Sequence, residues 1–242
     1  MKDLQHLLLP IILLLTGPAP RASSAWNRSD RGHEARSQPM PYMAYVQGKN
    51  QQSCGGFLVA PSWVMTAAQC LDYKPLIVIL GAHTVQRREA SGQRFEVQQY
   101  HRHPGFTSPR KGNDILLLKL KGNATTNHHV RTISFDTDRE LGGTKCSVKG
   151  WSHTTPTATL RQVCVTILKP RQCLNWNPGL AQNLICALNE SSEWPKKGDA
   201  GDPLVCNNKA YGIFSYRHQN WPGFYTHISP FLTWINSVMK SA

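Results

Sequence analysis

Acidic residues are scarce in this chain. Of its 242 residues, 14 are Asp or Glu and 27 are Lys or Arg, which gives a formal net charge of +13. Removing Lys2, Asp3 and Arg21 with the signal peptide expected below leaves +12. A field of this sign attracts polyanions and speeds association with them. The composition therefore favours an acidic ligand, although cations scattered along the sequence are also typical of a solvated surface.

Long apolar runs are absent outside the first residues. The run at residues 7–15 follows Lys2 and is too short to span a bilayer. Small residues at Ser23, Ser24 and Ala25 suit cleavage, so residues 1–25 are predicted to be a secretory signal peptide. Residues 26–28 then form a short propeptide-like remnant, and residues 29–242 form the domain. No second run follows, so we expect no transmembrane segment and a secreted product, extracellular or stored in a granule.

Metal-binding patterns and nucleic-acid-reading motifs are missing as well. His101 and His103 alternate on an expected strand, and His128 and His129 are adjacent, but no cysteine or carboxylate pattern accompanies them. A secreted chain without a reading motif is a poor candidate for binding nucleic acid. The sequence therefore predicts no metal, no cofactor and no nucleic-acid partner.

What is present indicates an all-β fold. Short apolar runs at residues 57–59, 76–80 and 115–118 are separated by Gly, Pro and Asn, which is typical of many short strands. At the C-terminus, Ser229 and Pro230 can start a helix. One face of that helix would carry Phe231, Trp234, Ile235 and Val238.

Several motifs occur in a fixed order along the chain. They are Cys54-Gly55-Gly56, Thr66-Ala67-Ala68-Gln69-Cys70, Asn113-Asp114-Ile115-Leu116, Gly150-Trp151, Gly198-Asp199-Ala200-Gly201-Asp202-Pro203 and Gly223-Phe224-Tyr225-Thr226. Together they resemble the trypsin-like serine protease family over about residues 32–238, nearest to its granzyme and azurocidin branch.

This resemblance implies two six-stranded antiparallel β-barrels, at about residues 29–135 and 136–228, and a C-terminal helix at about 229–240. It also implies the disulfides Cys54–Cys70, Cys146–Cys206 and Cys173–Cys186. With seven cysteines, Cys164 is left over. Its alternation with Val163 and Val165 puts it on the polar face of a strand. Either an intermolecular bridge, a capped thiol or an inert covered thiol fits this position.

The resemblance fails at the residues that carry the chemistry. In the family a serine attacks the substrate carbonyl, a histidine accepts its proton and an aspartate fixes the histidine tautomer. Here Gln69 and Ala200 stand at the histidine and serine positions, and Asp114 alone remains. An engineered Ser-to-Ala change would explain Ala200 only.

Other departures surround this degenerate triad. Asp202 replaces a glycine beside the oxyanion loop, whose remnants are Gly198 and Ala200, so a side chain and a charge are expected there. In the family, cleavage releases an apolar N-terminal residue whose ammonium group pairs with the aspartate at the position of Asp199. Ser29 would be that residue here, and it lacks the apolar side chain that favours this insertion. We therefore expect Asp199 to turn to water or to be held by other donors. The former specificity pocket, which we expect to be blocked, maps to Trp194, Tyr216 and Arg217.

Glycosylation sequons occur at Asn27, Asn123 and Asn189. Asn123 and Asn189 are expected at loop tips. A glycan at Asn27 would hinder cleavage after Arg28.

These features predict a catalytically inactive homologue that acts by binding. The favoured partners are anionic glycans, bacterial lipid or another anionic membrane surface, or an acidic protein surface, as the likeness to azurocidin implies. Two alternatives remain open: a regulator or decoy for active proteases, and a residual serine-type endopeptidase.

Overall fold

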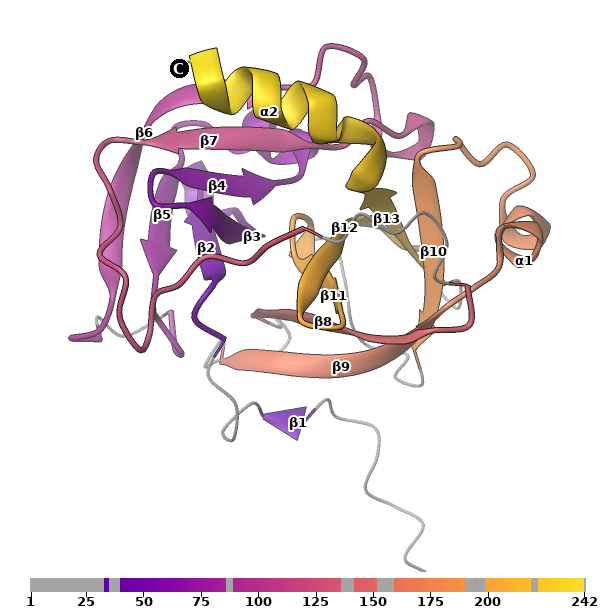
Figure 1. Ribbon diagram of the computed structural model, residues 1–242, viewed down its shortest axis with the longest axis horizontal. Coiled ribbons are helices and arrows are strands. Elements are labelled where there is room, and N and C mark those ends of the chain that lie inside the picture. Colours follow the sequence, from indigo (N-terminus) through magenta and orange to yellow (C-terminus); the bar gives the residue numbers. More distant parts are fainter. Residues whose placement is uncertain are drawn as a thin grey trace, which may run out of the picture.

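The computed structural model describes residues 40–85, 89–135, 142–151, 159–189, 199–218 and 222–241, and the backbone of the two-residue strand β1 (His33–Glu34). Its strands form two barrels that lie side by side (Figure 1). Trp194, Gly198 and Asn27, which the sequence marks as candidate sites, lie outside the described residues.

The first barrel closes through six antiparallel strands in the order β2-β3-β4-β7-β6-β5. Apolar runs broken by turn residues produce these short strands, and their buried side chains form one cluster that includes Phe57, Met65 and Leu118. The strands are β2 (Met43–Gln47), β3 (Ser53–Ala60), β4 (Trp63–Thr66), β5 (Ile77–Leu80), β6 (Gln93–Arg102) and β7 (Leu116–Leu120).

The second barrel closes in the order β8-β9-β10-β13-β12-β11, because β11 pairs with β8 as well as with β12. β1 adds to the outside of β9. The strands are β8 (Lys145–Trp151), β9 (Leu160–Ile167), β10 (Leu184–Asn189), β11 (Pro203–Cys206), β12 (Lys209–Tyr216) and β13 (Gly223–His227). The predicted fold of two six-stranded barrels is therefore confirmed.

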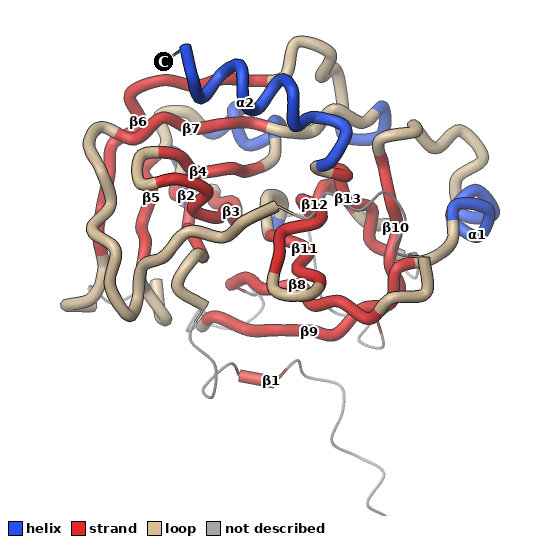
Figure 2. The backbone as a smooth tube through the Cα atoms, in the orientation of Figure 1, coloured by secondary structure: helices blue, strands red, loops and turns tan. Residues whose placement is uncertain are grey.

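Helices are few and short in the described chain, as Figure 2 shows. The C-terminal segment begins as a 3-10 turn, η5 (Ser229–Phe231), and continues as α2 (Leu232–Ser241). Phe231 and Ile235 are buried in the core cluster of the first barrel, and Trp234 and Val238 pack against it. The predicted apolar face thus packs the C-terminal helix, which follows β13 of the second barrel, against the first barrel. The other helices given by the described segments are η1 (Lys49–Gln51), η2 (Ala68–Tyr73), η3 (Pro109–Lys111) and α1 (Pro170–Trp176).

The structure contains the three disulfides that the resemblance implies, Cys54–Cys70, Cys146–Cys206 and Cys173–Cys186. Cys164 is exposed on β9 and forms no disulfide. A covering loop is therefore not seen over this thiol among the described residues.

The two described sequons differ in their setting. Asn123 is exposed in the loop after β7. The expectation that Asn189 lies at a loop tip is wrong, because Asn189 is the last residue of β10 and pairs with Val165 of β9. No helix in the described part of the chain is long and apolar enough to cross a membrane.

Candidate functional site

Asp114 lies where the two barrels meet, between η3 and β7, and its side chain is 0% exposed. The preceding Asn113 has a positive φ of 57°, a conformation that Asn tolerates better than most residues. Asn113 is held from both sides, because it donates to the Gly105 carbonyl at 2.9 Å and accepts from Asn183 Nδ2 at 2.6 Å. This local structure directs the Asp114 carboxylate into the junction.

The Asp114 carboxylate accepts hydrogen bonds from both barrels. From the first barrel, the Gln69 backbone N–H donates to Oδ1 at 2.9 Å and Gln69 Nε2 donates to Oδ2 at 2.7 Å. From β12 of the second, Ser215 Oγ donates to Oδ2 at 2.6 Å. Thr226 Oγ1 of β13 also donates to the Asp114 carbonyl at 3.1 Å. Asp114 therefore connects the barrels through a polar network.

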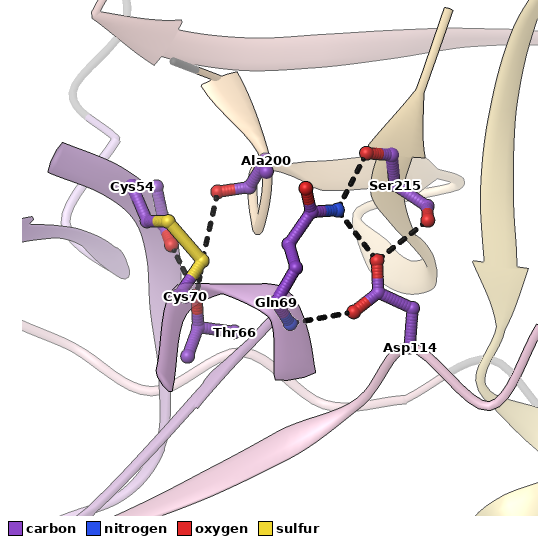
Figure 3. The surroundings of a disulfide bond; sticks show 8 residues. Cys54, Thr66, Gln69, Cys70, Asp114, Ala200 and Ser215 are labelled. Atoms are coloured by element: carbon purple, nitrogen blue, oxygen red, sulfur yellow. Dashed lines mark hydrogen bonds between the residues drawn. A yellow bond between two sulfur atoms is a disulfide. The ribbon is translucent and has the colours of Figure 1, made fainter. Parts of the chain in front are cut away.

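Gln69 follows β4 in the 3-10 helix η2 and reaches across to Asp114 (Figure 3). Its Nε2 donates to Asp114 Oδ2 and also to the Ser215 carbonyl at 2.8 Å. A carboxamide nitrogen carries two hydrogens, so both are used in these bonds. Figure 3 shows the carboxamide oxygen on the side away from Asp114. Gln69 therefore directs away from Asp114 an acceptor that cannot take up and return a proton near neutral pH.

Ala200 is 1% exposed and lies next to the Cys54–Cys70 disulfide. Its carbonyl accepts from the Gly55 N–H at 2.9 Å and lies 3.7 Å from the Cys70 sulfur (Figure 3). Gly201, which follows it, has φ 96° and donates to the Phe214 carbonyl of β12 at 2.8 Å. The loop is thus fixed by its backbone, and the side chain it presents is a methyl group without nucleophilic character.

Asp202 lies deeper in the same loop and is 1% exposed. Its carboxylate oxygens lie where a Cβ on either Gly55 or Gly150 would have to be. Within the described chain neither oxygen has a hydrogen-bond partner. Two glycines from two different strands therefore leave the space that this unusual side chain fills.

The buried carboxyl groups of Asp114 and Asp202 differ in the hydrogen bonds that stabilise their charged forms. Burial raises the pKa of Asp114, while hydrogen bonds from Ser215, Gln69 and Ala68 act in the opposite direction. The pKa of Asp202 is raised well above its ordinary range by burial and by the neighbouring Asp199. No described residue donates a hydrogen bond to the Asp202 carboxyl group, so burial favours the neutral carboxylic acid over the charge expected from the sequence.

Asp199 is 2% exposed, so the expectation that it turns to water is wrong. The reason is the packing of its loop: the Asp202 N–H donates to the Asp199 carbonyl at 3.0 Å, while Gly201 bonds to β12. That other donors hold the Asp199 carboxylate stays a prediction.

At the candidate specificity pocket, the Tyr216 ring stacks on Phe224 at 4.8 Å between centroids, with 12° between the ring planes. Arg217 is partly buried. Burial raises the pKa of the Tyr225 phenol, and the nearby Arg217 guanidinium lowers it. The structure thus brings Arg217 close to the buried Tyr225, while Trp194 is outside the described residues.

Two contributions were not anticipated from the sequence. The sequence motifs do not mark Ser215, although its hydroxyl and carbonyl both belong to the Asp114 and Gln69 network. Gly55 and Gly150 were assigned only to family motifs, although they enclose Asp202. Their sequence positions show the motif, but the contact between them depends on strand packing.

Comparisons with known proteins agree with this architecture. The family model described as Trypsin matches residues 30–235. Cathepsin G of Homo sapiens is 36% identical over 247 residues, covering 96% of this chain and 95% of its own length. Granzyme-like protein 1 of Rattus norvegicus is 35% identical, covering 97% and 99%, and Granzyme B of Homo sapiens is 35% identical, covering 96% and 98%. The chain therefore belongs to the trypsin-like serine protease family, among relatives that include cathepsin G and the granzymes.

Proposed function

We propose that this chain is a secreted, catalytically inactive member of its family that acts by binding. The observation that carries the proposal is the group formed by Gln69, Asp114 and Ala200. Hydrogen bonds join the first two, and the third has only a methyl group. This group has an orienting acid but neither a nucleophile nor a proton-accepting base.

The chemical cost of these two residues is large. Serine supplies the attacking oxygen in this mechanism, and histidine accepts its proton and then returns it. Removing either one lowers turnover by on the order of 10⁶, about as much as removing the whole triad. Asp114 has no imidazole to orient and instead holds the Gln69 carboxamide. Its remaining role is structural.

Asp202 supports the same conclusion independently of the triad positions. Its side chain fills the space between Gly55 and Gly150, beneath the loop that carries Ala200. Backbone donors can stabilise a developing oxyanion only when they are positioned toward it in advance. The Asp202 carboxyl group packs against this loop and restricts the positions that its backbone donors can adopt, whereas a glycine at position 202 would not.

The binding role rests on charge. With a net charge of +12 after removal of the expected signal peptide, the chain attracts anionic glycans, anionic membrane or bacterial lipid surfaces, and acidic proteins. Such attraction becomes specific only where cations are clustered, since scattered charges give general, salt-sensitive adhesion.

A second candidate from the non-enzyme class is a regulator or decoy for active proteases. It is favoured by the preserved barrel frame and by the distinctive Tyr216 and Arg217 at the candidate pocket. A residual serine-type endopeptidase is the alternative from the enzyme class.

Labelling with a serine-directed fluorophosphonate separates the enzyme from the non-enzyme. We expect no labelling of the purified mature chain under conditions in which an active trypsin-like protease is labelled stoichiometrically. Stoichiometric labelling of this chain would restore the endopeptidase hypothesis. Binding is tested by elution from heparin and from a sulfonate exchanger of equal charge density. We expect elution from heparin at the higher salt concentration, whereas equal elution would indicate bulk charge alone.

A further inference from the structure

The exposed large apolar side chains of the described chain gather beside α1. Leu174 and Trp176 of α1 are 43% and 38% exposed, and Leu188 of β10 is 40% exposed. Leu174 and Trp176 are two positions apart, so they leave the helix on different sides and flank Cys173. Figure 1 shows α1 at the outer margin of the second barrel, next to β10. The Cys173–Cys186 disulfide, with Cα atoms 5.9 Å apart, ties the helix to that strand.

Strand geometry places Leu188 on the face that α1 occupies. Side chains two apart on a strand point to the same face, so Leu188 is on the side of Cys186, whose sulfur bonds to α1. Asn189 alternates to the other face, opposite the buried Val165.

Cations border these apolar side chains. Lys169 and Arg171, at the start of α1, are exposed. Lys145 of β8 pairs with Thr166 of β9, which pairs in turn with Leu188, so these three side chains share the outer face.

No acidic residue occurs between Gly142 and Asn189 in the sequence. All the charged side chains of that stretch are positive, and they are Lys145, Lys149, Arg161, Lys169 and Arg171. The face beside α1 therefore combines apolar side chains and cations without compensating negative charge from its own elements.

We propose that the outer side of the second barrel around α1, which carries Lys145, Lys169, Arg171, Leu174, Trp176 and Leu188, docks on anionic lipid membranes. The proposal rests on the binding role proposed above and names its surface and its ligand class. Trp and Leu side chains enter the boundary between headgroups and acyl chains, and Lys and Arg side chains bind the acidic headgroups. A sulfated glycan would use the cations but would gain little from exposed Leu174 and Leu188, which favours the membrane.

The test is sedimentation of the mature chain with vesicles of phosphatidylcholine alone or with added phosphatidylglycerol. We expect binding only to the second kind. In a charge variant, Lys169→Glu with Arg171→Glu, affinity should fall at least about 25-fold, because each cation near an anionic surface contributes about fivefold. Acidic residues are favourable in the first turn of a helix, so these changes are compatible with α1.

The matched control is Lys49→Glu with Lys240→Glu. It makes the same change in net charge at two exposed residues outside this face. Its affinity should fall no more than about threefold, since only long-range attraction is lost. An equal loss in control and charge variant would overturn the proposal.

An apolar variant separates membrane from glycan. Leu174→Ser, Trp176→Ser and Leu188→Thr keep every cation, and they should weaken vesicle binding about tenfold or more while leaving elution from heparin unchanged. Vesicle binding unchanged in this variant would mean that the face is not inserted, and the membrane proposal would be wrong. Absence of vesicle binding by the wild-type chain would also overturn it, but the proposed lack of catalysis would stand or fall separately on fluorophosphonate labelling.

Discussion

Replacing Asp202 by Asn should change how stability depends on pH. The Asn side chain has nearly the same shape as that of Asp, so it keeps the packing against Gly55 and Gly150, but it has no carboxyl group to titrate. The groups that act on Asp202 are Asp199, whose charge raises its pKa, and the buried Tyr225 phenol. Both are retained in the variant, which removes one ionisation from the interacting pair of Asp199 and Asp202.

The direction of the effect follows from the raised pKa. An unfolded Asp titrates near 3.8, and burial together with Asp199 raises the pKa of Asp202 in the folded chain. Between these two pKa values the folded chain binds one more proton than the unfolded chain. The contribution to stability is therefore complete below pH 3.8 and is lost as pH rises through the folded pKa. Within that interval the free energy of unfolding falls by about 1.4 kcal/mol per pH unit.

The assay is urea denaturation of both proteins at a series of pH values from acid to slightly alkaline. Other groups, including His101 and His103, whose pKa burial lowers, titrate in both proteins and cancel in the difference. We expect Asp202→Asn to gain stability relative to the wild type as pH rises, with a slope that approaches about 1.4 kcal/mol per unit. A constant difference across the whole pH range would refute the reasoning, because it would mean that Asp202 titrates alike in folded and unfolded chains.

Three further predictions concern the triad positions and Cys164. Gln69→His with Ala200→Ser should leave peptide-ester cleavage more than about 100-fold below that of an active relative, because the Asp202 loop is unchanged; turnover within that range would show that the loop matters little. Asp114→Ala should lower the free energy of unfolding by about 2–4 kcal/mol in urea titrations, since it leaves the Gln69 N–H, one Gln69 Nε2 hydrogen and Ser215 Oγ without their acceptor; an unaffected midpoint would contradict a structural role. Cys164→Ser should abolish disulfide-linked dimers on non-reducing gels of oxidised protein without shifting the melting temperature, and dimers that persist would point to another cysteine.

The fold could be predicted from the sequence because its signals are local or are spaced motifs. Short apolar runs gave the strands, and the spacing of Phe231, Trp234, Ile235 and Val238 gave the face of α2 that packs on the first barrel. The disulfide partners followed from the family order. Asn189 was misplaced because a polar residue before a polar stretch suggests a loop, whereas pairing with β9 extends β10 to this residue.

The candidate site could be predicted only as a set of positions. Gln69, Asp114 and Ala200 were marked by their motifs, but the use of both Gln69 Nε2 hydrogens depends on Ser215, which is 146 residues away along the chain. The inward position of Asp199 and the neutral form favoured for Asp202 depend on burial in the packed barrels. Burial is a tertiary property, so residue type alone suggests a turn to water at Asp199, which the structure does not have, and a charge at Asp202, which burial disfavours.

Asp202 also changes what its neighbouring glycines do. Gly55 of strand β3 and Gly150 of strand β8 belong to sequence motifs that other members of the family can also carry. Here a Cβ at either position would collide with the Asp202 carboxyl group, so Asp202 requires both residues to remain glycine. Gly55 also donates to the Ala200 carbonyl and accepts from Thr66, which connects the packing of Asp202 to the backbone of the loop. Gly55 thus contacts both the Asp202 side chain and the backbone of the loop that carries Ala200. Because Asp202 would remain in place, we expect restoring histidine and serine alone to leave the site inactive.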